Sequence, residues 1–412
     1  CWWMTEAVPV AVTGLLPIVL FPVFGVSDIG DATAPYAHPL IFLFLGGFMV
    51  ALAMEACDLH RRIALNIIGI VGSHPQAIIL GFMIATALLS MWISNTATTM
   101  MMLPIASTIA ALLVADATRA GDDHHTSRFG LCLMLGIAYS ASVGGVGTLI
   151  GTPTNATMAG ILSDEFGVEI GFAQWMLVGL PFVAVMLPLT WLILTKLIYP
   201  FELPNSDKAV KHVRSAQAGL GRMSSAERRV SLVAGMVAFL WIGRGFAPDL
   251  IPGLSDTGIA MFGGLVLFLI PAGGDNRETL LTWSVIRRLP WDIVLLFGGG
   301  MSLARGMGNS GLAGWISDGL TVLGTWPTVF LIAAIVTVVI YLTELTSNVA
   351  TTTAFVPVIG ALAIGLGTDP VLLAAPVAMA ASCAFMLPVA TPPNAIVFSS
   401  GLVTIPQMVR AG

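Results

Sequence analysis

Two short polar strings each interrupt an apolar stretch of the chain. Residues 94–99 read Ser-Asn-Thr-Ala-Thr-Thr, and residues 347–352 read Ser-Asn-Val-Ala-Thr-Thr. An unpaired hydroxyl or amide in hydrocarbon costs roughly 2–7 kcal/mol, so such clusters need a partner. Neutral hydroxyl and amide oxygens suit a hard monovalent cation such as sodium, because they lack the full charges that favour calcium or magnesium. The same groups, with helix N-termini beside them, can also donate hydrogen bonds to carboxylates.

The polar strings belong to a longer internal duplication, in which the second string follows the first by 253 residues (347 minus 94). Three blocks recur in the same order: a glycine-rich block (43–49 and 296–301), the Ser-Asn string (94–99 and 347–352) and a Thr-Pro block ending in asparagine (151–155 and 390–394). This order indicates two related halves. For Gly46 and Gly47, close helix packing is an alternative interpretation.

Fixed charge is missing from these blocks, since neither the Ser-Asn strings nor the Thr-Pro blocks contain Arg or Lys. An anionic substrate would then depend on bound sodium ions for positive charge, unless a charge elsewhere in the fold reaches it. Substrate and cation would each raise the other's affinity, as linkage requires. The pattern therefore predicts coupled transport.

Two acids, Glu6 and Glu344, lie within apolar runs. Intramembrane acids are functional candidates by default. Glu344 precedes Ser347 by three residues, and we expect it to pair with a donor, to orient the polar string or to take up a proton.

Composition shows what must surround these motifs. Of 412 residues, 57% are hydrophobic and 9% are charged, whereas soluble domains carry about 25% charged residues. Most of the surface must therefore face lipid.

The sequence offers no clear metal or enzyme site. The four cysteines have no metal-site spacing, and the run Asp122–His125 is expected to be a solvated loop. The six histidines form no constellation typical of a membrane enzyme. There is no basic arm for nucleic acid.

The elements that position the motifs are predicted to be helices, and several apolar runs are shorter than the about 20 residues that span a bilayer. Short runs broken by Gly, Pro, Ser and Thr predict re-entrant hairpins and unwound helices. We expect a first membrane repeat (1–200), a polar linker (201–229) and a second repeat (230–412). An odd number of crossings per half would invert the second repeat and place the site at the midplane. The Lys and Arg residues of the linker, with Arg61-Arg62 and Arg287-Arg288, make those loops cytoplasmic candidates.

The chain resembles the divalent-anion/sodium symporters, which include sodium-coupled di- and tricarboxylate carriers. Besides the duplicated blocks, the resemblance rests on residues 2–9 (Trp-Trp-Met-Thr-Glu-Ala-Val-Pro), His60-Arg61-Arg62, Pro290-Trp291 and Thr391-Pro392-Pro393-Asn394, and it covers nearly the whole chain. It implies an all-α inverted repeat with two re-entrant hairpins and two unwound helices. It also implies a homodimer in membrane lipid, with scaffold and transport domains that move as an elevator.

The resemblance also implies site residues. The first sodium site would use Ser90, Ser94 and Asn95 with a backbone carbonyl near Gly144. The second would use Thr343, Thr346 and Asn348 with the carbonyl of Ala390. The substrate carboxylates would meet Asn95, Thr96, Gly145, Thr152, Ser347, Asn348, Thr391 and Pro392. Two departures from the family pattern are Val349, which replaces a threonine and loses a hydroxyl, and Thr154, which replaces a residue that is often Pro or Gly.

The predicted function is sodium-coupled symport of C4-dicarboxylates such as succinate, malate or fumarate, in a multi-pass plasma membrane protein. Citrate, tartrate-like acids and sulfate stay open as substrates. A sodium-independent dicarboxylate exchanger of the same family is the nearest alternative, and an ion channel is the alternative from another class. The abrupt ends at Cys1 and Gly412 suggest a longer natural chain with a further helix at each end.

Overall fold

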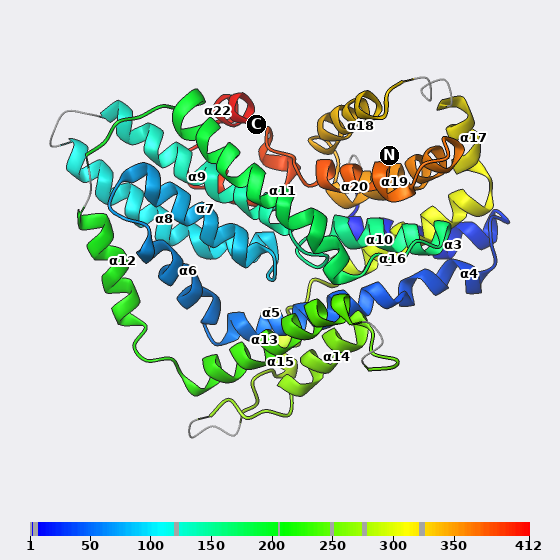
Figure 1. Ribbon diagram of the computed structural model, residues 1–412, viewed down its shortest axis with the longest axis horizontal. Helices are drawn as coiled ribbons and strands as arrows, with labels where there is room; N and C mark the ends of the chain where they lie inside the picture. Colours follow the sequence, from blue (N-terminus) through cyan, green and yellow to red (C-terminus); the bar gives the residue numbers. More distant parts are fainter. Residues whose placement is uncertain are drawn as a thin grey trace.

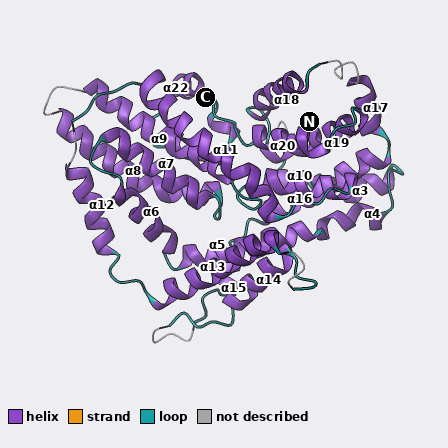
Figure 2. Cartoon of the chain, in the orientation of Figure 1, coloured by secondary structure: helices purple, strands orange, loops and turns teal. Residues whose placement is uncertain are grey.

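The computed structural model describes residue 2 and residues 7–118, 123–204, 207–247, 251–273, 278–320 and 326–412. Within these ranges the chain is helical, apart from one isolated bridge between Pro271 and Thr279 (Figure 2). Glu6 and Asp122 lie outside the described residues. Six helices in the described part are long and apolar enough to span a membrane: Ile29–Ala56, Asn95–Leu113, Ser127–Gly145, Phe172–Ile198, Ser225–Phe246 and Asn348–Gly365. The expectation of an all-α, multi-pass membrane protein is confirmed.

The first half builds a helical hairpin and a broken helix. Its N-terminal helices are α2 (Val10–Thr13), α3 (Leu16–Val23), α4 (Ile29–Thr33) and η1 (Ala34–Ala37), followed by α5 (Pro39–Ala56), α6 (Leu59–Ile70), α7 (Pro75–Ser90), α8 (Asn95–Thr118), α9 (Asp123–Gly145), α10 (Pro153–Phe166), α11 (Phe172–Leu192) and the π-helical turn η2 (Ile193–Ile198). The hairpin is α7–α8, with its tip at residues 91–94. The helical path breaks between α9 and α10, at residues 146–152.

The polar middle of the chain contains a helix of its own, α12 (Asp207–Gly219). It is followed by α13 (Ser225–Phe246), α14 (Asp256–Leu267) and α15 (Trp283–Ile286). The start of α13 lies inside the polar linker, because Ser224 and Glu227 form a capping box that satisfies each other's backbone N–H groups.

The second half repeats the order of the first. It contains α16 (Trp291–Asn309), α17 (Leu312–Leu320), α18 (Thr328–Thr343), α19 (Asn348–Gly365), α20 (Pro370–Ala381), η4 (Pro388–Ala390), α21 (Pro392–Phe398) and α22 (Ile405–Ala411). Here the hairpin is α18–α19, with its tip at 344–347, and the broken helix is α20–α21. Proline opens α7, α10, α20 and α21, where its missing N–H costs nothing.

The two hairpins lie on opposite sides of the molecule, and α10 and α16 pack against α19 of the second hairpin (Figure 1). Glycines permit close contacts along this framework. A Cβ at Gly46 would lie 2.4 Å from the backbone of Ala260 on α14, and one at Gly144 would lie 2.4 Å from the Cα of Ala87 on α7. Helix packing therefore explains Gly46, in agreement with the alternative interpretation.

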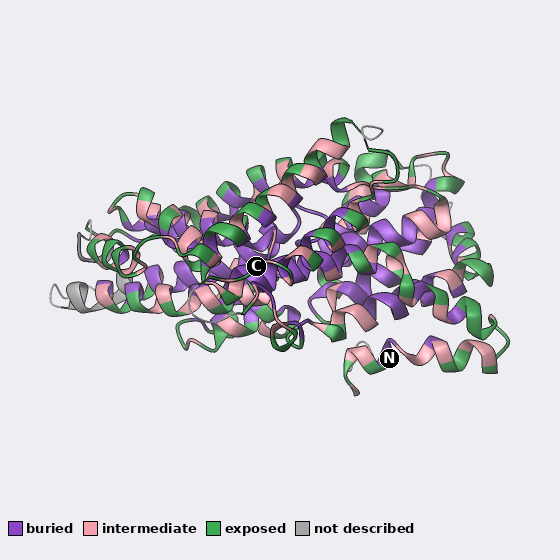
Figure 3. Cartoon of the chain, turned by 90° about the horizontal axis from the view of Figure 1, so that it is seen from below, coloured by how far each residue is buried: buried purple, intermediate pink, exposed green. Residues whose placement is uncertain are grey.

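Burial separates the inner helices from the outer ones (Figure 3). The helix Ser127–Gly145 is almost entirely buried, whereas the outer helices α11 and α13 expose large apolar side chains such as Leu177 and Phe239. In a membrane these side chains contact acyl chains, which explains why so much apolar surface stays uncovered by protein.

Candidate functional site

The tip of the first hairpin rests against the buried broken helix. Ser90 ends α7 and Asn95 begins α8, and the Ser90 hydroxyl donates to the carbonyl oxygen of Ala141 at 2.8 Å. The acceptors around Asn95 orient its amide nitrogen toward Ser90 Oγ (2.5 Å), the Ala141 carbonyl (3.2 Å) and the Gly151 carbonyl (3.3 Å). The tip is thereby joined to the segment that separates α9 from α10.

The second hairpin repeats this arrangement, with a threonine in place of the serine that ends the first helix of the hairpin. Thr343 Oγ1 lies 2.9 Å from Asn348 Oδ1 and 3.0 Å from the carbonyl oxygen of Ala381. Thr343 stands where Ser90 stands in the first half, and the residues at both positions are fully buried. A hydroxyl has one proton for these two acceptors, so one oxygen is left without a hydrogen. Such a surplus of acceptor oxygens is what a cation site requires.

Each helix break is held by one buried asparagine. The Asn155 amide nitrogen donates to the carbonyl oxygens of Thr148 (2.8 Å), Gly145 (3.3 Å) and Val146 (3.3 Å). The Asn394 amide nitrogen donates to the carbonyls of Ala384 and Leu387, both at 3.0 Å. These bonds satisfy carbonyls that the interrupted helices leave without intrahelical partners.

The amide oxygens of the same two asparagines have no hydrogen-bond partner, although both residues are completely buried. Sequence reasoning assigned no role to either asparagine. The signal was present, because each closes a duplicated Thr-Pro block, 239 residues apart (394 minus 155).

The two breaks are in contact with each other. Thr154 Oγ1 lies 2.7 Å from Ser382 Oγ, a contact between residues 228 positions apart. The Tyr139 hydroxyl donates to the carbonyl of Phe385 at 2.8 Å. Both polar strings, both breaks and both Thr-Pro blocks therefore occupy one region.

The expected sodium-site residues are only partly grouped by these contacts. Ser94 Oγ accepts from the Ala97 N–H (3.2 Å), so it caps α8, and Thr346 Oγ1 pairs with Thr351 Oγ1 (2.6 Å). Gly144 and Gly145 end α9, directly before the break, and a Cβ at Gly145 would lie 2.7 Å from the side-chain amide of Asn95. Glycine at this position therefore lets the break approach the hairpin tip.

The expected substrate residues border the same region. Asn95, Thr96, Ser347 and Asn348 are half-buried at the two tips. Thr152 and Thr391 are buried, each directly before the proline that opens α10 or α21, and Thr391 Oγ1 accepts from the Asn394 N–H at 3.3 Å. Ala390 is also buried, while Pro392 is exposed.

Glu344 binds the second break with its carboxylate. Oε1 accepts from the N–H groups of Phe385 (2.7 Å) and Met386 (2.8 Å), and Oε2 accepts from that of Leu387 (2.9 Å). The expectation that Glu344 pairs with donors is confirmed, and its role in orienting the hairpin stays a prediction. Because Met91 occupies the matching position of the first tip (344 minus 253), the two halves differ here.

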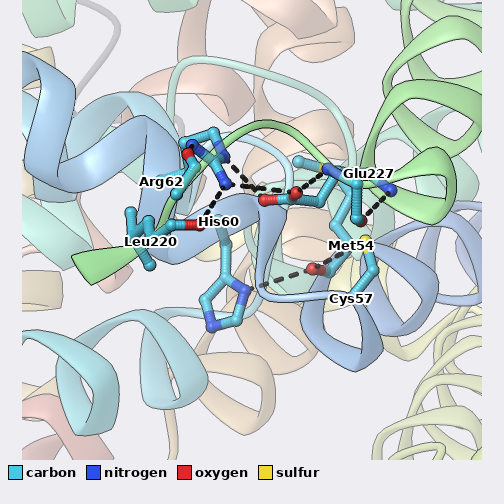
Figure 4. A network of polar contacts seen from close by, with 8 residues as sticks. Met54, Cys57, His60, Arg62, Leu220 and Glu227 are labelled. Atoms are coloured by element: carbon cyan, nitrogen blue, oxygen red, sulfur yellow. Dashed lines mark hydrogen bonds and ion pairs between the residues drawn. The ribbon is translucent and has the colours of Figure 1, made fainter. Parts of the chain in front are cut away.

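A separate polar network joins α6 to the start of α13 (Figure 4). Arg62 Nε lies 2.7 Å from Glu227 Oε1, and its guanidinium also donates to the carbonyls of Gly221 (3.0 Å) and Leu220 (3.1 Å). His60 Nδ1 lies 3.2 Å from the Met54 carbonyl, and burial lowers the pKa of this imidazole. Arg62, the last residue of the His-Arg-Arg motif, thus fixes the linker to the first half.

Comparison with known proteins places these features in context. The family model for the sodium:sulfate symporter transmembrane region matches residues 1–412. The sodium-dependent dicarboxylate transporter SdcS of Staphylococcus saprophyticus is 42% identical over 417 residues, covering 100% of this chain and 80% of that protein, and SdcS of Staphylococcus aureus gives the same values. The solved YdaH transporter of Alcanivorax borkumensis aligns with TM-score 0.60 and 14% identity, over 93% of this chain and 82% of that one. At that identity the likeness concerns the fold alone.

Proposed function

This chain belongs to the sodium:sulfate symporter family, and we propose that it is a sodium-coupled symporter of C4-dicarboxylates in the bacterial plasma membrane. The observation that carries the proposal is a buried hydroxyl beside a side-chain amide and a backbone carbonyl of the adjoining broken helix, built twice, at Ser90–Asn95 and at Thr343–Asn348. Relatives with 42% identity bear the name sodium-dependent dicarboxylate transporter.

Two sodium sites are proposed at the hairpin tips. The first comprises Ser90, Ser94 and Asn95 with a carbonyl near Gly144. The second comprises Thr343, Thr346 and Asn348 with the carbonyl of Ala390. Hydroxyl, amide and carbonyl oxygens are the hard, neutral ligands that suit sodium. Asn155 and Asn394 act as positioning residues, since they hold the breaks whose carbonyls face the tips.

The dicarboxylate is proposed to bind between the tips, one carboxylate toward each half. Its contacts would be Asn95, Thr96, Gly145, Thr152, Ser347, Asn348, Thr391 and Pro392. Four helices, α8, α10, α19 and α21, begin in this region. Their N-terminal N–H groups and dipoles favour an anion, and the sodium ions supply the remaining positive charge.

We further propose that the chain forms two inverted repeats (1–200 and 230–412) joined by a linker (201–229). In the same proposal the protein is a homodimer and moves its substrate by an elevator mechanism. The Lys- and Arg-rich linker supports a cytoplasmic position for its side of the protein. Asp164 on α10 contacts both His38 (3.3 Å) at the start of α5 and Arg305 (3.2 Å) on α16. In an elevator movement of α10 past α5 and α16, both contacts would have to separate.

Uptake of labelled succinate into proteoliposomes tests the proposal. A symporter accumulates succinate under an inward sodium gradient but not under an equal potassium gradient. Equal uptake in both salts that requires dicarboxylate inside the vesicle would identify an exchanger. A current that does not saturate with succinate would identify a channel.

A further inference from the structure

A cavity of about 300 Å³ lies between α12, α6 and the outer ends of α7 and α8, away from the transport site. Apolar side chains form much of its wall: Ile68, Ile70, Val71, Ile78, Ile109, Val210 and Val213. Gly72 and Ser73, from the loop between α6 and α7, complete it. Two cations, Lys211 and Arg214, line the cavity from α12.

The two cations are available to a ligand. They are three residues apart, so they lie on one side of α12. Both are exposed, and neither forms an ion pair with a described residue. Arg62 is different, because Glu227 already neutralises it.

The position of α12 is set by contacts with α6. Val213 is buried, and the Gln217 amide donates to the Leu65 carbonyl at 2.8 Å. Beside the cavity, Ile70 at the end of α6 is 85% exposed. An acyl chain lying against the end of α6 would cover this exposed apolar side chain.

We propose that this cavity binds one anionic phospholipid, with the phosphate between Lys211 and Arg214 and the upper part of an acyl chain against the apolar wall. The arrangement matches a lipid's own polarity, with cations at one end and hydrocarbon at the other. Inorganic phosphate would satisfy the cations but leave the apolar wall exposed to water. Since α12 contacts both α6 and α8, the lipid would join the linker to the first hairpin.

Native mass spectrometry of the purified, delipidated protein tests the site with phosphatidylglycerol, phosphatidylcholine or inorganic phosphate at matched ionic strength. Wild type should bind one phosphatidylglycerol well above phosphatidylcholine. Lys211→Ala combined with Arg214→Ala should bind it about thirtyfold more weakly. The matched control, Arg222→Ala with Arg228→Ala, removes two exposed linker cations outside the cavity and should bind like wild type.

A second variant tests the apolar part. Gly72 lines the cavity, and a Cβ there would meet no atom within 4 Å, so Gly72→Phe adds apolar bulk to the cavity wall without removing charge. It should weaken phosphatidylglycerol binding while leaving sodium-dependent uptake intact. Equal binding by both double variants would overturn the proposal in favour of general surface attraction. Displacement of the lipid by equimolar phosphate, or undiminished binding by Gly72→Phe, would overturn the acyl-chain site.

Discussion

The hydroxyl of Thr343 offers the sharpest test of the sodium sites. Thr343→Val keeps the shape of the side chain and removes one oxygen. That oxygen lies 2.9 Å from Asn348 Oδ1 and 3.0 Å from the Ala381 carbonyl, in a fully buried position. Since valine fills the same space, no cavity forms, and the effect reports the missing oxygen.

The expected magnitude follows from the interaction between the Thr343 oxygen and a bound sodium ion. An interaction with a charged partner contributes about 1.5–3 kcal/mol, and each 1.4 kcal/mol changes an equilibrium constant tenfold. Removing one sodium ligand should therefore raise the sodium concentration for half-maximal uptake roughly 10- to 150-fold. Thr343→Ser, which restores the oxygen, should return it to within a few-fold of wild type.

The assay is sodium-dependent succinate uptake in proteoliposomes at saturating succinate. The matched control is Thr337→Val on the same helix, where the exposed hydroxyl donates to the Ala333 carbonyl at 2.7 Å, and its sodium dependence should equal that of wild type. If Thr343→Val, incorporated at normal levels, stays within twofold of Thr337→Val, the hydroxyl is not a sodium ligand and the second site is placed wrongly.

Three further predictions concern buried polar contacts. Asn155→Leu and Asn394→Leu each leave buried carbonyls without donors, and each unsatisfied carbonyl costs about 1–3 kcal/mol of folding free energy. Both variants should therefore lower the melting temperature and impair sodium-dependent uptake. Normal uptake in either variant would contradict a positioning role. Glu344→Gln keeps the side chain's size but replaces a carboxylate oxygen that accepts backbone N–H groups. The sodium concentration for half-maximal uptake should therefore rise severalfold in the same assay. An unchanged concentration would refute the role of Glu344 in orienting the tip. Arg62→Ala removes the cation that neutralises Glu227 and leaves its carboxylate with the Ser224 N–H. The melting temperature should fall and partly recover when Glu227→Gln is added, whereas no recovery would argue against the ion pair as the cause.

The membrane class, the helical fold and the two polar strings as candidate sites could all be predicted from the amino-acid sequence. These properties depend on local polarity: long apolar runs must be helical in lipid, and polar strings within them must be paired. The duplicated Ser-Asn strings therefore located Asn95 and Asn348 before any of their neighbours in space were known.

The partners of those residues depend on the three-dimensional packing. Asn155 and Asn394 hold the breaks, Glu344 binds backbone N–H groups more than 40 residues later, and Arg62 pairs with Glu227 across 165 positions. A polar residue in a membrane helix has several ways to satisfy its hydrogen bonds, and local sequence does not distinguish among them. Packing distinguishes them, because it determines which carbonyls and charges come within about 3 Å of each side chain.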